Sequence, residues 1–137
     1  MRETNQSKLR IFLLGWLPLI AACVAIFIQS SFRGPERMPE VRFLDKLLHF
    51  GVYAVLGILF YRAYETLPLK DNRRLLIFFS IISAIFFGIS DEIHQYFVPF
   101  RHAELLDVMA NCAGSISGVF FYDWWKIRKK LPLLGKS

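Results

Sequence analysis

Four long apolar stretches, separated by short polar segments, dominate the chain of 137 residues. The first, Ile11 to Ile28, is uncharged and long enough to cross the hydrocarbon core of a bilayer as a helix. A soluble helix keeps one polar face, which these blocks lack over most of their length. The pattern predicts an all-α membrane protein, a single unit over residues 1–137, with helices at about 11–30, 44–64, 75–97 and 105–125.

The segments between the blocks are short and carry helix-breaking residues, among them Pro35, Pro39, Pro68 and Pro99. Short connections make consecutive helices antiparallel, so we expect an up-down bundle of four transmembrane helices. Inside the first block, Pro18 removes a backbone donor and predicts a local kink. This block exceeds the apolar core of a signal peptide, which favours an uncleaved anchor.

Basic residues gather at one end of these helices. They lie before the first block, in the second connection and in the tail: Arg2, Lys8, Arg10, Arg62, Lys70, Arg73, Arg74, Lys126, Arg128, Lys129, Lys130 and Lys136. The positive-inside rule therefore predicts that both termini face the cytoplasm. The net charge of +6 comes from these flanking residues, so it indicates lipid head groups and not nucleic acid. Trp124 and Trp125 are typical of an interfacial belt.

Ionisable and amide side chains inside the blocks lie at one depth, within about 10 Å of the expected outer interface. They form three helical stripes: Asp45, His49 and Tyr53; Gly88, Asp91 and Gln95; and Asp107, Asn111, Gly114 and Gly118. Charge below the head groups is costly, so the adjacent acids Asp91 and Glu92 need partners. Lys46, His49 and Arg101 are the cations that the sequence offers.

Purely structural explanations exist for most of these residues. Asp45 and Lys46 could be ordinary helix-end charges at the interface, and Asn111 could simply bond helices together. Gly114 and Gly118 form a GxxxG motif, which favours close packing within the bundle or in a homodimer. The two free cysteines follow no metal or redox spacing and are expected to be small apolar side chains.

Three motifs follow one another along the chain: Asp45-Lys46-x-x-His49-Phe50-x-x-Tyr53, Asp91-Glu92-x-x-Gln95-x-x-x-Pro99-x-Arg101 and Asp107-x-x-x-Asn111-x-x-Gly114-x-x-x-Gly118. Together they resemble the VanZ-like family, over about Asp45 to Gly118. The resemblance implies a small multi-pass protein of the bacterial cytoplasmic membrane, in a family whose founding member is linked to teicoplanin resistance. One position departs from the family, because Phe100 stands where Gly usually precedes the motif Arg. Glycine would allow a positive φ there, so with Phe100 the sequence does not fix the turn or the direction of Arg101.

The leading hypothesis is a role at the cell envelope, in which the protein binds or modulates a lipid-linked or amphiphilic ligand at the outer leaflet. Cationic side chains would hold a phosphate or carboxylate, acids would orient those cations, and amides would supply hydrogen bonds. The expected ligand-binding residues are Asp45, Lys46, His49, Tyr53, Glu92, Gln95, Arg101, Asp107 and Asn111.

A second hypothesis is a membrane-embedded hydrolase or transferase acting on an envelope lipid. Asp91, Glu92 and His49 are its candidates for general acid and base. No cofactor is expected, although Asp91, Glu92, Asp107 and a histidine are suitable ligands for a divalent metal. A third hypothesis is an accessory subunit that packs through Gly114 and Gly118 against a larger membrane-protein partner.

Overall fold

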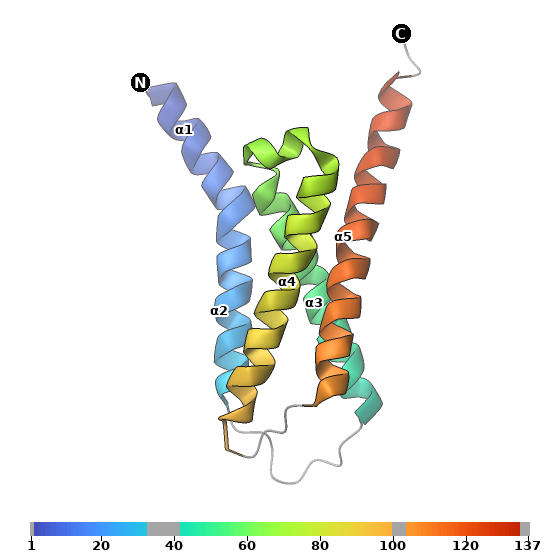
Figure 1. The fold of residues 1–137 in the computed structure, drawn as a ribbon. Helices are drawn as coiled ribbons and strands as arrows, with labels where there is room; N and C mark the ends of the chain where they lie inside the picture. Colours follow the sequence, from blue (N-terminus) through green and yellow to red (C-terminus); the bar gives the residue numbers. More distant parts are fainter. Residues whose placement is uncertain (1, 33–41, 100–103, 135–137) are drawn as a thin grey trace.

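The computed structural model describes residues 2–32, 42–99 and 104–134, and all of its regular elements there are helical. Figure 1 shows an up-down bundle with both termini at one end. The elements are α1 (Arg2–Ile11), η1 (Phe12–Trp16), α2 (Leu17–Ser31), α3 (Arg42–Tyr64), η2 (Pro68–Asp71), α4 (Arg73–Tyr96) and α5 (Leu105–Leu134).

Four helical spans among the described residues are long and apolar enough to cross a membrane: Gln6–Ser31, Phe43–Tyr64, Arg73–Tyr96 and Leu105–Lys129. This confirms the predicted all-α bundle of four membrane-spanning helices. We call the end that holds both termini and η2 the terminal end, and the end where α4 stops and α5 begins the site end. That the terminal end faces the cytoplasm stays a prediction.

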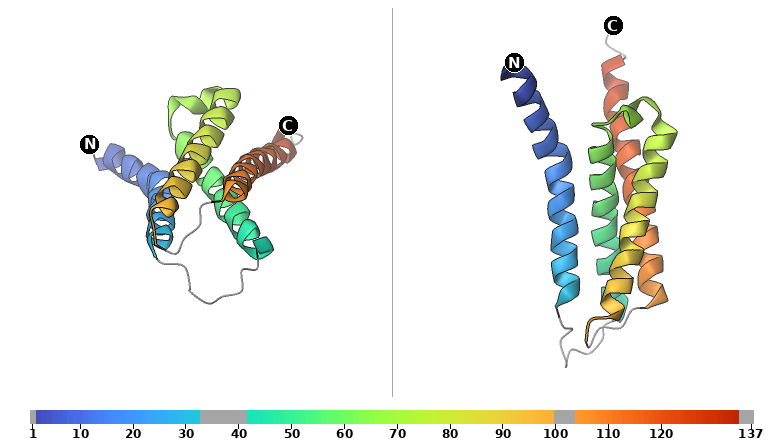
Figure 2. Two further views of the ribbon diagram at one scale, coloured as in Figure 1. Left: turned by 60° about the horizontal axis from the view of Figure 1, so that its bottom comes forward. Right: turned by 60° about the vertical axis from the view of Figure 1, so that its left-hand side comes forward.

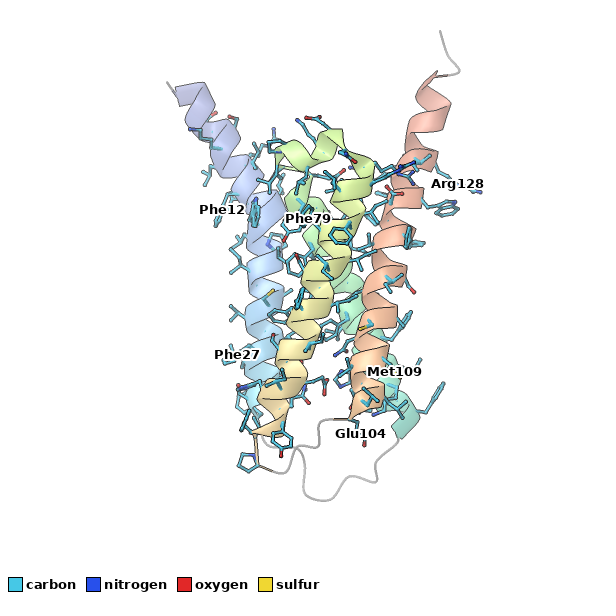
Figure 3. The ribbon with its side chains drawn as sticks, in the orientation of Figure 1. Phe12, Phe27, Phe79, Glu104, Met109 and Arg128 are labelled. Atoms are coloured by element: carbon cyan, nitrogen blue, oxygen red, sulfur yellow. The ribbon has the colours of Figure 1, made fainter. Side chains whose placement is uncertain are left out.

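The outside of the bundle is apolar, whereas several of its buried positions are polar. Phe12, Phe27 and Met109 point away from the bundle in Figure 3 and are 45%, 55% and 59% exposed. Ser80 and Ser115 are completely buried. This distribution suits a protein whose outer surface meets lipid tails and whose helices are joined by polar contacts.

Helices α3, α4 and α5 form the tightly packed part of the bundle, and α2 lies along α3 and α4 (Figure 2). The contact between α3 and α5 is close because glycines face backbone. A Cβ atom on Gly114 would lie 2.9 Å from the carbonyl carbon of Phe50, and one on Gly118 would lie 2.7 Å from that of Ala54. The GxxxG motif therefore packs α5 against α3 within one chain.

The first membrane span is irregular at Phe12–Trp16, where the helix widens into one π turn, shortly before Pro18. Proline has no N–H to donate to the carbonyl four residues earlier, which is that of Leu14. The Arg62 guanidinium donates to this carbonyl instead, over 3.1 Å. The kink expected from Pro18 is thus found as a π turn just N-terminal to this proline. Before this turn, α1 leans away from the other helices (Figure 1).

Polar contacts join the helices at the terminal end. Arg73 makes a two-pronged ion pair with Asp123, which also accepts a 2.8 Å hydrogen bond from Tyr61. Helix α5 continues to Leu134, beyond its expected end near Trp125. In this extension the cations of Arg128 and Lys129 lie 4.3 Å and 4.0 Å from the ring centroids of Trp124 and Trp125. Aromatic rings beside cations are typical of a membrane interface.

The buried hydroxyl of Tyr61 gives a test of these contacts. Tyr61→Phe is expected to lower the free energy of unfolding by about 1 kcal/mol, because Asp123 loses one of its donors. Unfolding of the purified protein by SDS in mixed micelles would measure this change. Tyr96→Phe, at a position that is 73% exposed, is the matched control and is expected to change little. Equal effects of the two substitutions would contradict a stabilising hydrogen bond from Tyr61 to Asp123.

Candidate functional site

Polar side chains from α3, α4 and α5 meet at the site end of the bundle. Figure 3 shows Glu104 at this end and Arg128 at the opposite one. Helical spacing brings the side chains together, because steps of three and four residues place them on the inner face of each helix. The described residues of this cluster are Asp45, Lys46, His49 and Tyr53 of α3, Asp91, Glu92 and Gln95 of α4, Glu104 just before α5, and Asp107 and Asn111 of α5.

Lys46 forms the cationic part of the rim, where the cluster is partly exposed. Its Nζ lies 2.8 Å from Glu104 Oε2 and 3.4 Å from Asp45 Oδ2, and it forms a closer ion pair with the buried Asp107. Three carboxylates therefore surround one ammonium group. The charge of Lys46 is already balanced, which weakens the expectation that this residue holds an anionic ligand by itself.

His49 lies at the centre of the cluster and has polar groups at both ring nitrogens. Its Nδ1 is 3.0 Å from Asn111 Oδ1 and 3.5 Å from Glu92 Oε1. Its Nε2 is 3.9 Å from Asp45 Oδ1, on the exposed side. If Nδ1 donates to the Asn111 carbonyl oxygen, the neutral ring presents the lone pair of Nε2 toward the rim.

Glu92 is the group of the cluster whose burial needs most explanation. It is only 4% exposed, and its Oε1 accepts a 3.4 Å hydrogen bond from the Asn111 amide. Its second oxygen, Oε2, is buried and has no hydrogen-bond partner among the described residues. Because an unsatisfied carboxylate oxygen is costly to bury, it needs an explanation beyond helix packing.

Asp91 follows a different pattern, although it adjoins Glu92 in the sequence. Its Oδ2 accepts hydrogen bonds from the Tyr53 hydroxyl at 3.2 Å and from the Gln95 amide at 3.1 Å. Gln95 also donates to Ser30 of α2, over 3.4 Å. Asp91 is thus held by neutral donors toward α2, whereas Glu92 faces His49. This separates the two acids into a structural carboxylate and a candidate reactive one.

Asp45, His49 and Asp107 each offer one ligand atom, and these atoms all lie within 4.8 Å of one another. This grouping shares Asp107 and a histidine with the set expected from the sequence, but uses Asp45 in place of Asp91 and Glu92. Carboxylate and imidazole groups are suitable ligands for a divalent cation. The Lys46 ammonium contacts both acids, so an ion at this position would have to displace it.

Two positions discussed from the sequence, Phe100 and Arg101, lie outside the described residues. Sequence reasoning missed other polar contacts at this end. Glu104, three residues before Asp107, pairs with Lys46, and its helix-start position was the available signal. The serines of α2 were missed because they end an apolar block. Ser31 Oγ is 3.0 Å from His94 Nε2, and the His94 ring stacks on Phe27.

Comparison with known proteins identifies the family of the chain. The sequence matches the VanZ/LLP1 family over residues 4–126. It is also 27% identical, over 96 residues, to the uncharacterized protein C11E3.10 of Schizosaccharomyces pombe (strain 972 / ATCC 24843). That alignment covers 70% of this chain and 57% of the yeast protein, so similar sequences are not confined to bacteria. No solved structure matches the chain. The match over nearly its whole length shows that this multi-pass membrane protein belongs to the VanZ/LLP1 family.

Proposed function

We propose that the protein is a membrane-embedded hydrolase or transferase that acts on the polar head group of a lipid-linked envelope component. The observation that carries this proposal is the setting of His49, which is flanked by Glu92 and Asn111 at one ring nitrogen and by Asp45 at the other. A histidine that is hydrogen-bonded at one ring nitrogen, with a buried acid close to that nitrogen, is suited to general acid–base catalysis.

The roles within the cluster follow from exposure. Nε2 of His49 faces the rim, where it would take a proton from water or from an acceptor hydroxyl while that oxygen attacks the phosphorus of the head group. The bond from phosphorus to the departing oxygen breaks as the new bond forms, and the imidazolium then returns its proton to the departing oxygen. Glu92 would stabilise the imidazolium that forms, which accounts for a buried carboxylate whose Oε2 has no hydrogen-bond partner among the described residues. Lys46 would stay paired with Asp45, Glu104 and Asp107, and would thereby reduce the repulsion between these acids and a phosphate or carboxylate of the substrate.

The surroundings of the cluster fit a substrate that stays in the bilayer. Apolar side chains near the site end, including Phe43 and Leu47 of α3 and Leu106 of α5, are 74%, 49% and 58% exposed. An acyl or polyprenyl chain could lie along them while its head group reaches the rim. We place this end at the outer face of a bacterial cytoplasmic membrane, from the distribution of basic residues.

The direct test is incubation of purified protein with radiolabelled lipid-linked envelope precursors that carry phosphate or diphosphate. We expect release or transfer of the labelled head group by the wild-type protein and none by His49→Gln. His94→Gln is the matched control, because His94 lies at the same end but bonds Ser31 and stacks on Phe27. Absence of product with every precursor, or equal loss in both variants, would reject the proposal.

Chelation tests the role of a metal. We expect EDTA to change the wild-type rate by less than about twofold, because the Lys46 ammonium holds the acids that a divalent ion would use. The measurement is turnover before and after dialysis against EDTA. Loss of activity that Mg²⁺ or Mn²⁺ restores would instead assign Asp45, His49 and Asp107 as metal ligands.

A second candidate function is binding without turnover, which would also accommodate a link to teicoplanin, since a lipoglycopeptide likewise combines an acyl chain with a polar head. The buried oxygen of Glu92 favours it, because a ligand donor could satisfy that atom. A helper role through the GxxxG face is less well supported, because Gly114 and Gly118 already face the backbone of α3. Saturable retention of an intact precursor, with no product, would favour binding.

A further inference from the structure

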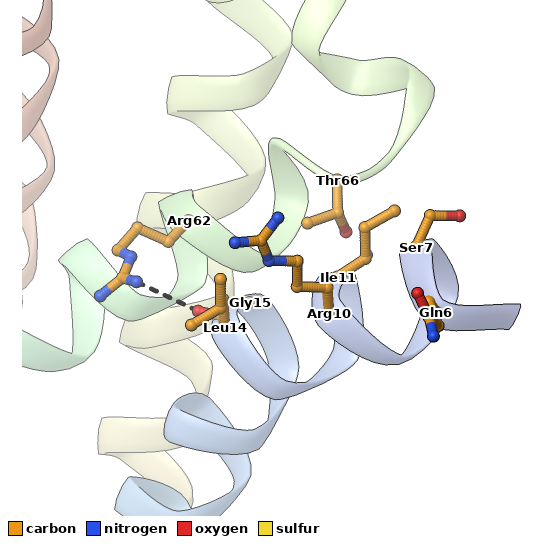
Figure 4. A pocket seen from close by; sticks show the side chains of 8 residues that line it. All are labelled: Gln6, Ser7, Arg10, Ile11, Leu14, Gly15, Arg62 and Thr66. Carbon is orange, nitrogen blue, oxygen red and sulfur yellow. Dashed lines mark hydrogen bonds between the residues drawn. The ribbon is translucent and has the colours of Figure 1, made fainter. Parts of the chain in front are cut away.

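A second polar region of the bundle lies at the terminal end, far from the candidate functional site. It is a cavity of about 750 Å³ between α1 and η1 on one side and the end of α3 on the other (Figure 4). Its lining combines two guanidinium groups with hydroxyl groups and aliphatic side chains: Arg10, Arg62, Ser7, Thr66, Ile11 and Leu14. The described part of its lining holds no acidic side chain.

The irregular first span builds this cavity. The π turn and Pro18 leave the Leu14 carbonyl without its usual helical donor, and Arg62 donates to it over 3.1 Å, as the dashed line in Figure 4 shows. Arg62 is thereby fixed at the cavity wall. Thr66 is fixed as well, because its hydroxyl donates to the Ala63 carbonyl and accepts from the Trp16 indole at 2.9 Å.

Arg10 is the second arginine of this cavity. It lies on the exposed face of α1, and it makes no ion pair with any residue that the structure describes. Among the described residues that line it, the cavity therefore presents two positive charges and no acid. Guanidinium groups bind phosphate oxygens through paired N–H donors, which makes a phosphate group the best-fitting anion.

We propose that this cavity binds the phosphate head group of an anionic phospholipid in the leaflet at the terminal end. The depth agrees, because Arg10 directly precedes the uncharged apolar block Ile11–Ile28, which is where basic residues meet lipid head groups. Ile11 and Leu14, which are 47% and 59% exposed, give the adjoining acyl chains an apolar surface. Arg10 and Arg62 hold the phosphate, and the lipid thereby bridges the leaning α1 to the end of α3. This site does not depend on the proposed catalytic function.

The experiment uses Trp16 as a reporter beside the cavity, in a full-length Trp124→Phe, Trp125→Phe background. The protein is reconstituted in phosphatidylcholine vesicles that contain brominated phosphatidylglycerol or brominated phosphatidylcholine, which quench nearby indole fluorescence. We expect brominated phosphatidylglycerol to associate near Trp16 at least about twentyfold more strongly, and Arg10→Gln to reduce this preference by about fivefold. Arg62→Gln is expected to remove it further, since the Leu14 carbonyl also loses its donor.

Lys8→Gln is the matched control, because it removes the same charge from the same helix but Lys8 does not line the cavity. It is expected to keep the lipid preference within about twofold. An equal loss in Lys8→Gln and Arg10→Gln would show diffuse attraction and overturn the proposal, as would equal quenching by both lipids in the wild type. If inorganic phosphate at matched ionic strength abolishes the preference, the cavity takes free phosphate and the lipid assignment is wrong.

Discussion

Gly118→Leu is expected to prevent stable packing of α5 on α3 and to have the largest effect on stability of any single substitution considered for this protein. Even a Cβ atom at this position would lie 2.7 Å from the Ala54 carbonyl carbon, and Ala54 Cα is only 2.8 Å away. Backbone atoms cannot turn aside as a flexible side chain would, so the two helices would have to separate. We expect the free energy of unfolding to fall by about 3 kcal/mol or more.

SDS titration in mixed micelles, followed by circular dichroism, would measure this loss. Gly51→Ala is the matched control on the opposing helix, because a Cβ there meets nothing within 4 Å. That substitution is expected to stabilise the protein by about 0.5–1 kcal/mol, since glycine is a poor helix former. If Gly118→Leu unfolds at the same SDS concentration as the wild type, the close α3–α5 contact is wrong.

The same experiment separates a GxxxG motif that packs within one chain from one that joins two chains. If the motif made a homodimer, Gly118→Leu would produce a folded monomer with an intact helical bundle. Because the glycines face Phe50 and Ala54 of the same chain, we expect unfolding or loss of membrane abundance instead. Size-exclusion chromatography of whatever folded protein remains distinguishes these results.

Much of this architecture could be predicted from the sequence, because hydrophobic length and helical spacing are local properties. The apolar blocks predicted the membrane spans, and steps of three and four residues predicted that Asp107, Asn111, Gly114 and Gly118 share one buried face. The resemblance to the VanZ-like family, drawn from motifs on three helices, is confirmed by the family match over residues 4–126.

The pairing of charges could not be predicted, because spacing gives the face of each helix but not its rotation against its neighbours. Asp91 and Glu92 were expected to share the available cations, yet Asp91 bonds Tyr53 and Gln95, which are neutral. Lys46 instead binds the acids of the α5 start. Likewise, Pro18 predicted a disturbed helix but not that Arg62 would bond the freed carbonyl.

Glu92→Gln is expected to abolish turnover of a lipid-linked substrate while leaving the protein as stable as the wild type, or more stable by about 1 kcal/mol. Gln keeps the shape of the side chain and can still accept from Asn111. It removes a buried carboxylate whose second oxygen has no described partner, and a neutral amide costs less to bury. The loss of function follows because Gln cannot stabilise the imidazolium of His49.

The expected fall in rate is about 10²–10⁴-fold, the usual contribution of general acid–base catalysis. It is measured as release of labelled head group at saturating substrate, alongside unfolding by SDS.

Asp91→Asn is the substitution to compare with Glu92→Gln. Asp91 accepts hydrogen bonds from the Tyr53 hydroxyl and the Gln95 amide, so loss of its carboxylate should lower stability more than activity. A buried acid kept only for packing would give the reverse pattern at Glu92, with reduced stability and a rate that follows the amount of folded protein. If Glu92→Gln lowers turnover but not stability, and Asp91→Asn lowers stability more than turnover, then Glu92 acts in catalysis at the rim and Asp91 stabilises the fold.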